Sequence, residues 1–90
     1  MINITVFAGK IVKDDENDPL IRYVEIYQEF LSEKGDIKKE LVPVMNWNKE
    51  RKGELFTFSI NTLLIIKGRL ENYKGRFVVI CENLTYLGKE

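Results

Sequence analysis

The segment "KGRLENYKGR", residues 67–76, places an aromatic ring among basic side chains. The ring is Tyr73, and the cations around it are Lys67, Arg69, Lys74 and Arg76. Single-stranded nucleic acids are bound by this combination, because rings stack on bases while cations neutralise the phosphates. Two interpretations stand at this point: the segment is either the solvated end of a hairpin or a clamp on a nucleic-acid strand.

A second aromatic–basic group follows an apolar run. Trp47 ends "LVPVMNW", and three cations come directly after it: Lys49, Arg51 and Lys52. An exposed indole beside such cations can stack on a base, whereas large rings are more often buried in a core or an interface. The sequence favours stacking slightly over burial.

A tyrosine pair is the third candidate. Tyr23 and Tyr27 alternate with Val24 and Ile26, which puts the two rings on one face of a strand. That face is either a stacking platform or else a mixed solvated face or subunit contact, and the sequence supports the two interpretations equally.

The overall charge does not favour a polyanion ligand. The 90 residues contain 14 basic and 14 acidic side chains, so the net charge is zero. Only local clustering of charge would make a nucleic-acid surface. Such clustering is present, because the acidic side chains Asp14, Asp15, Glu16 and Asp18 crowd one loop while basic groups gather at 34–39, 49–52 and 67–76.

Several classes of activity are disfavoured. There is no histidine, and Cys81 lies in the apolar run "RFVVICENL", where a buried thiol is expected. Nucleophile–base pairs and phosphate-binding glycine loops are missing, and "DDENDP" lacks the spacing of a calcium loop. We therefore expect no enzyme activity, no cofactor and no metal. No apolar stretch is long enough to span a membrane, so a cytoplasmic protein is expected.

One domain covering residues 1–90 must position these groups. Alternation and β-branched content predict strands over 1–12, 37–47, 62–70 and 76–87. Residues 20–31 fit a strand better than a helix, and 49–62 fit a short helix or an irregular connection. Gly9 and Gly68 indicate bends or bulges, Pro43 an edge or bulge, and Gly75 a tight turn. The fold class predicted is all-β: a five-stranded OB-fold barrel interrupted between its third and fourth strands.

Three stretches resemble bacterial single-stranded DNA-binding proteins: "MINITVFAGKIVKD", "ELVPVMNWNK" and "LLIIKGRLENYKGRFVVICENLTYLG". The family's first strand, third strand and last two strands follow these patterns in the same order. The resemblance is weakest over residues 49–62, where the family has a longer helix. The acidic tail of the family is not seen after Lys89-Glu90, which also fits tail-less relatives of the primosomal replication protein N type. The resemblance implies that Trp47 stands at a base-stacking position.

Together these observations predict sequence-independent binding of single-stranded DNA in DNA replication or repair, with RNA as an alternative ligand. The predicted site contains the rings and cations Trp47, Tyr27, Tyr73, Tyr23, Lys49, Arg51, Lys52, Lys67, Arg69, Lys74 and Arg76. The competing hypothesis is an accessory OB-fold module, of primosome or phage type, that acts through protein contacts, including replication proteins. Leu41, Pro43 and Met45 share the strand face opposite Val42 and Val44, which are expected in the core. That face and the apolar first strand predict a homodimer or homotetramer.

Overall fold

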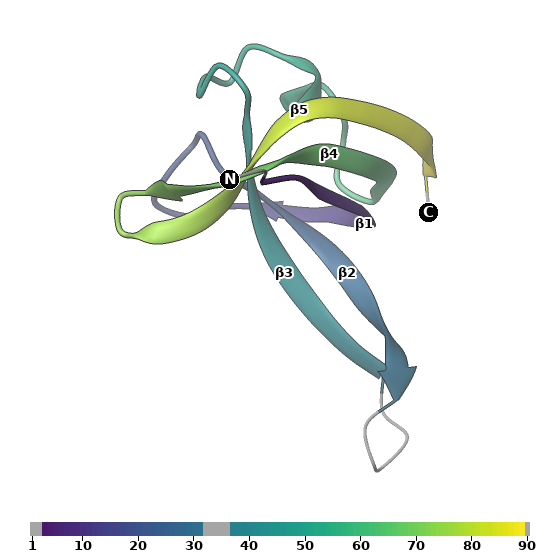
Figure 1. Cartoon of the computed structure of the whole chain (residues 1–90). Coiled ribbons are helices and arrows are strands. Elements are labelled where there is room, and N and C mark those ends of the chain that lie inside the picture. The colour runs from purple at the N-terminus through teal and green to yellow at the C-terminus, as the bar shows by residue number, and fades with distance from the viewer. Residues whose placement is uncertain (1–2, 32–36, 90) are drawn as a thin grey trace.

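The computed structural model describes residues 3–31 and 37–89, without the side chains of 27–31 and 37–38. Five strands make up most of it: β1 (Thr5–Asp14), β2 (Arg22–Leu31), β3 (Ile37–Asn46), β4 (Thr62–Tyr73) and β5 (Arg76–Lys89). They close a barrel in the order β1-β2-β3-β5-β4, in which β4 returns to β1 (Figure 1). The strand assignment for residues 20–31 is thereby confirmed.

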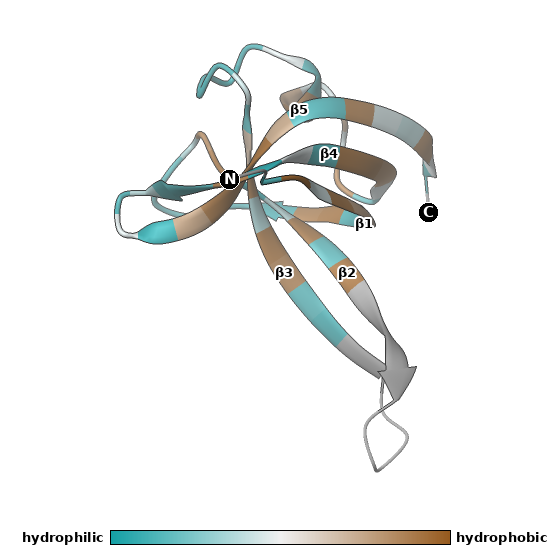
Figure 2. Cartoon of the chain, viewed as in Figure 1, coloured by the Kyte–Doolittle hydropathy of each residue, from teal (hydrophilic) through white to brown (hydrophobic). Residues whose placement is uncertain are grey.

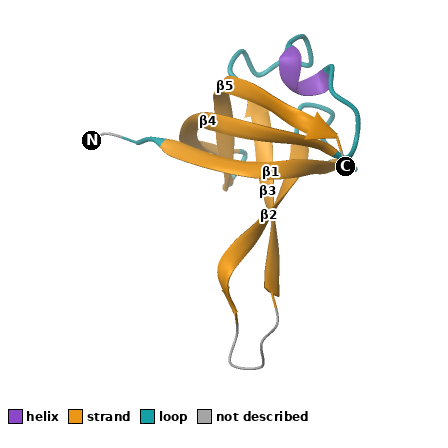
Figure 3. Ribbon diagram, turned by 90° about the vertical axis from the view of Figure 1, so that its right-hand side faces the viewer, coloured by secondary structure: helices purple, strands orange, loops and turns teal. Residues whose placement is uncertain are grey.

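The connections identify the fold. Every neighbouring pair of strands is antiparallel except β3 and β5, which run parallel through Val44↔Val79 and Asn46↔Cys81. The segment between β3 and β4 contains a single 3-10 turn, Glu54–Phe56, and lies over one end of the barrel (Figure 3). A five-stranded closed barrel with this order and this interruption is an OB-fold, as the sequence predicted.

The barrel interior is filled by one apolar cluster. Its buried members come from every strand and from the 3-10 turn: Ile11, Val24, Val44, Leu55, Leu64, Ile66, Val79 and Cys81. Val42 packs against this cluster, so Val42 and Val44 lie on the core side as expected. Cys81 is a buried small hydrophobe, and burial raises the pKa of its thiol to about 11.

A second apolar cluster lies outside the barrel. Its members are Ile21, Met45, Val78 and Ile80, and we call it the outer cluster. The β1–β2 loop (residues 15–21) supplies Ile21 and is hydrophilic where it starts and hydrophobic where it ends (Figure 2). The expectation that Met45 leaves an open apolar position is therefore wrong, because this loop covers it completely. Leu41, on the same strand face, stays exposed.

Arg22 fastens the connection between β3 and β4 to the barrel. Its guanidinium is buried and donates to the carbonyl oxygens of Leu55 at 2.9 Å and Phe58 at 2.6 Å. Its Nε donates to Asp14 Oδ1 at 2.6 Å, which balances the buried charge. One side chain thus satisfies two carbonyls of an irregular segment that has few backbone partners.

Two glycines shape the β4–β5 hairpin. A Cβ on Gly68 would lie 1.8 Å from the carbonyl oxygen of Ile80, and the β4–β5 register shifts between Lys67 and Gly68. At the other end, Lys74 and Gly75 have φ of 51° and 88° and join Tyr73 to Arg76 in a two-residue turn. The bulge at Gly68 and the tight turn at Gly75 are both as predicted.

The bend expected at Gly9 is displaced. The β1–β2 register shifts between Ile11 and Lys13, while Gly9 permits close approach of β2: a Cβ there would lie 2.6 Å from the carbonyl oxygen of Glu25. Pro43 pairs with Tyr23 just before β3 begins to pair with β5, so it lies where β3 has a strand on one side only. This position fits the predicted edge.

β2 and β3 extend beyond the barrel as a two-stranded arm (Figure 1). The polar segment "SEKGDIKKE" predicts a turn with Gly35 between these two strands, and residues 32–36 of it lie outside the described residues. Within residues 3–31 and 37–89, no helix has the length and hydrophobicity needed to cross a membrane.

We expect Gly68→Ala to destabilise the barrel by about 3 kcal/mol, because the added methyl group overlaps backbone that cannot move without breaking the β4–β5 pairing. Urea unfolding measures the change. Gly75→Ala is the comparison: nothing lies within 4 Å of its added Cβ, so only its left-handed φ opposes the change, by about 1–2 kcal/mol. Equal losses in the two variants would show that close packing at Gly68 is unimportant.

Candidate nucleic-acid interface

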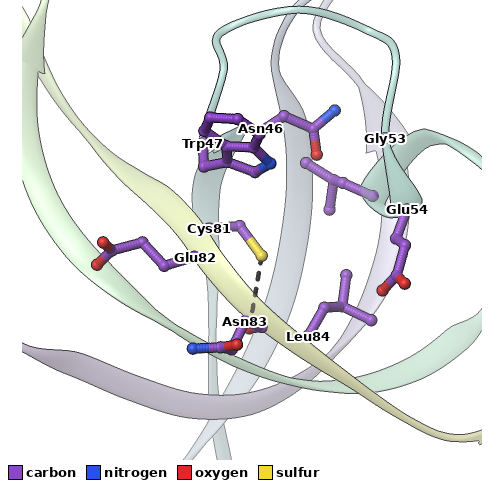
Figure 4. Close-up of a pocket in the computed structure, with 9 residues that line it drawn as sticks. Asn46, Trp47, Gly53, Glu54, Cys81, Glu82, Asn83 and Leu84 are labelled. Atoms are coloured by element: carbon purple, nitrogen blue, oxygen red, sulfur yellow. Dashed lines mark hydrogen bonds between the residues drawn. The ribbon is translucent and has the colours of Figure 1, made fainter.

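Among the described rings of the predicted site, Trp47 is the most exposed. It follows the last residue of β3, and 68% of its surface is accessible, so it is not a core residue within this chain. The indole borders an open pocket of about 430 Å³. Figure 4 shows Trp47 and Glu54 on opposite sides of this pocket, with the Glu82 side chain pointing away from it. A flat ligand therefore has access to the indole without any rearrangement of the barrel.

The cations after Trp47 have different surroundings. Lys49 pairs with Glu71 at 2.9 Å, whereas Arg51 donates to the Pro19 carbonyl oxygen at 2.6 Å and lies 4.5 Å from the Phe56 ring centroid. Lys52 is exposed and has no partner among the described residues. Lys52 is thus the cation of this loop that can bind a ligand without first leaving a protein partner.

The hairpin ring is less open than expected. Tyr73 is half-buried and packs against the outer cluster, with Lys74 Nζ 5.2 Å from its ring centroid. The position of Tyr73 next to the turn at Gly75 predicts an exposed ring. That expectation overlooked the β1–β2 loop, whose apolar end lies against the same surface.

The acidic loop is not separate from the basic hairpin. Arg76 Nη2 lies 3.4 Å from Asp15 Oδ1, and Lys74 Nζ lies 3.9 Å from Asp18 Oδ2. The β1–β2 loop and the hairpin tip project on the same side of the barrel (Figure 1). The segregation of charge along the sequence therefore does not persist in the fold, because acidic and basic segments are brought into contact.

The two remaining hairpin cations lie on β4. Arg69 pairs with Glu82 at 3.2 Å across the β4–β5 ladder. Lys67 is exposed and has no partner in the described part of the chain. Lys67 and Lys52 are therefore the unpaired cations of the predicted site.

Tyr23 belongs to a polar network. Its hydroxyl donates to Asp15 Oδ1 at 2.6 Å and accepts from Arg76 Nη1 at 2.9 Å, while Lys13 Nζ lies 5.4 Å from its ring centroid. Hydrogen bonds from the Tyr23 hydroxyl and from the backbone amides of Asn17 and Asp18 hold the pKa of Asp15 at about 2. Half-buried and bonded on both sides, Tyr23 is a poor platform for stacking in this arrangement.

The second tyrosine of the pair lies on the arm. The backbone of Tyr27 pairs with Lys39 in the β2–β3 ladder. Its side chain is outside the described set, so the predicted stacking by Tyr27 stays a prediction.

Phe77 and Tyr86 alternate within the last strand, which predicts that both rings pack, but both are exposed. Phe77 is 67% accessible and Tyr86 55%, although Tyr86 also stacks on Phe58 at 5.6 Å between centroids. Alternation places Phe77 on the inward side with Val79, but the hairpin continues beyond the barrel, where there is no interior to fill. The only feature of the sequence that indicated exposure of Phe77 was its position next to the turn at Gly75.

Comparisons with known proteins add little. No family model matches the sequence, and no curated protein matches it. Among solved structures, the N-terminal domain of PriB protein from Thermoanaerobacter tencongensis, described as dimeric, is 14% identical with a TM-score of 0.49. The alignment covers 94% of this chain and 96% of that one. A similarity of this degree does not establish a function, and the fold assignment above rests on the strand order.

Because the pKa of Asp15 is about 2 in the folded chain and near 3.8 when unperturbed, its ionised form stabilises the fold. That stabilisation is complete above pH about 4 and is lost as the pH falls toward about 2. Thermal unfolding followed between pH about 5 and 2 should show a flatter decline for Asp15→Asn than for the wild type. Glu16→Gln, in the same loop but without a partner among the described residues, should decline like the wild type. Identical curves for Asp15→Asn and the wild type would contradict the assignment.

Proposed function

We propose that this OB-fold binds single-stranded DNA without sequence preference, using Trp47 as its main stacking ring. The observation that carries the proposal is the open indole at the end of β3, next to a loop that holds Lys49, Arg51 and Lys52. A base stacked on an exposed indole contributes roughly 1–3 kcal/mol, and every base offers a π-face. Stacking of this kind does not read sequence.

The phosphate contacts fall into two groups. The side chains of Lys52 and Lys67 can bind a phosphate without first breaking another interaction, since these side chains have no partner in the described chain. The others must leave a protein partner first: Lys49, Arg51, Arg69, Lys74 and Arg76. This division accounts for a nucleic-acid surface on a chain with zero net charge.

We assign further rings to the site by their accessibility. Phe77 joins Trp47 as an exposed ring, while Tyr23 and Tyr73 offer only part of their faces. Tyr27 remains a proposed contact on the arm. The same rings would stack on RNA bases, so RNA is the alternative ligand. The role proposed for the protein is in DNA replication or repair, as the sequence resemblance implies, and its proposed location is the cytoplasm.

A homodimer is part of the proposal. Phe7 packs on the core, so its neighbours Ile4 and Val6 face outward, where they are 63% and 60% exposed. In the described chain, residues 5–8 pair with β4 on one side and with no strand on the β2 side. An open edge with exposed apolar side chains can pair antiparallel with the same edge of a second copy, which makes a self-complementary contact.

The second candidate function is an accessory module that acts through protein contacts. It is favoured by the exposed apolar residues of β1 and by the pairing of four of the proposed phosphate-binding cations with carboxylates. In that case replication proteins, rather than a nucleic acid, would occupy the surface.

Titration with oligo(dT) tests the two functions against each other. We expect salt-sensitive binding that quenches the fluorescence of Trp47, the single tryptophan of the chain. By anisotropy of a labelled oligonucleotide, Trp47→Ala should lose roughly 1–3 kcal/mol of affinity, while its melting temperature changes little because the ring is exposed. Tyr86→Ala, which removes an exposed ring outside the proposed site, is the matched control. If the wild type does not bind oligo(dT) at low salt, binding of single-stranded DNA is refuted and the protein-contact function remains.

The proposed dimer is tested by sedimentation at tens of micromolar protein. Val6→Lys should produce a monomer, because it places a desolvated cation in the centre of the contact. Ile60→Lys adds the same charge at an exposed apolar position of the β3–β4 connection and should leave the dimer intact. A monomeric wild type would overturn this part of the proposal.

A further inference from the structure

Both cations at the hairpin tip are already neutralised by the chain's own carboxylates. Lys74 faces Asp18, and Arg76 faces Asp15, so the β1–β2 loop holds acidic groups where phosphates would bind. We propose that Asp15 and Asp18 act as internal competitors of the nucleic-acid backbone for these cations, and so set the affinity and salt dependence of binding. The inference rests on the proposed function and concerns the regulation of that site.

The carboxylates are held by their own loop rather than by the cations. Asp15 Oδ2 accepts from the backbone amides of Asn17 at 3.1 Å and Asp18 at 2.9 Å, and its Oδ1 accepts from the Tyr23 hydroxyl. Asp18 Oδ1 accepts from the amide of Leu20 at 3.0 Å. Their positions therefore persist when the cations leave.

The loop itself cannot swing aside at low cost. Its last residue, Ile21, is buried in the outer cluster together with Met45 and Ile80, and lifting it would expose apolar surface of this cluster to water. Arg51 also donates to the Pro19 carbonyl oxygen at 2.6 Å. The exchange of partners must therefore come from movement of the basic side chains, while the loop stays in place.

The two cations should be released unequally. The Lys74 side chain is 74% exposed and meets Asp18 at 3.9 Å, the geometry of a weak surface pair. Arg76 is less exposed and also donates to the Tyr23 hydroxyl at 2.9 Å. Lys74 is therefore the cation that a phosphate captures first, and Arg76 mainly holds the hairpin against Tyr23.

Salt dependence follows from this arrangement. A phosphate contact with a free cation contributes about 0.7 to the slope of log affinity against log salt on a single strand. A paired cation contributes less, because salt also weakens the internal pair that must break. The wild-type slope should therefore be flatter than the number of bound cations implies.

The test compares Asp18→Asn with Glu16→Gln. Both variants remove one negative charge from the β1–β2 loop, but only Asp18 contacts a hairpin cation in the described chain. Asparagine keeps the side-chain oxygen that accepts from Leu20, so the loop should retain its conformation. Melting temperatures of both variants verify that it does.

We expect Asp18→Asn to bind oligo(dT) about two- to fivefold more tightly than the wild type at low salt, the equivalent of one surface ion pair. Its slope should be steeper by up to about 0.7. Glu16→Gln should stay close to the wild type in both quantities. In a double-mutant cycle, Lys74→Gln should weaken binding more in the Asp18→Asn background than in the wild type.

Each outcome bears on one proposal. If the wild type binds and Asp18→Asn behaves like Glu16→Gln, competition by the loop is refuted while the proposed function stands. If Lys74→Gln has the same effect in both backgrounds, the pair with Asp18 does not limit binding, and the inference fails again. If no variant binds oligo(dT), the proposed function itself fails.

Discussion

The burial of Ile21 against the outside of the barrel is the contact on which the rest of the surface depends. Each aliphatic side chain buried in the outer cluster contributes roughly 1.5–3 kcal/mol, whereas an exposed ion pair contributes roughly 0–1 kcal/mol. The apolar end of the β1–β2 loop therefore decides where the loop lies. The ion pairs from Asp15 to Arg76 and from Asp18 to Lys74 follow from that placement.

This placement changes what the hairpin can offer a ligand. Tyr73 and Tyr23 both pack against the outer cluster, and the Tyr23 hydroxyl and Arg76 form a hydrogen-bonded network with Asp15. Two of the open rings lie at the ends of strands: Trp47 directly follows β3, and Phe77 is the second residue of β5. Accessible rings thus occur where strands pass beyond the barrel and packing ends.

The placement of the β1–β2 loop also explains how a chain of zero net charge can present the proposed site for a polyanion. Salt screens the repulsion between its acidic side chains and a distant polyanion. At short range, the same acidic side chains pair with individual cations. Of the four pairs in the proposed site, those of Lys49, Arg69 and Lys74 are exposed enough to exchange, while the pair of Arg76 is reinforced by Tyr23. In the proposed site, affinity would then depend on the local exchange of ion-pair partners rather than on net charge.

The strands, their order along the chain and the all-β class can be predicted from the sequence, because these depend on local alternation and on glycines at a bulge and a turn. Phe77 shows where alternation fails: it predicts which side of a strand a residue faces, but not whether anything covers that side. Met45 shows the reverse, since it faces outward and is buried by a loop some 25 residues earlier in the chain. Only the tertiary structure could decide the pairing of Asp18 with Lys74, because side chains 56 residues apart meet only after the barrel has closed.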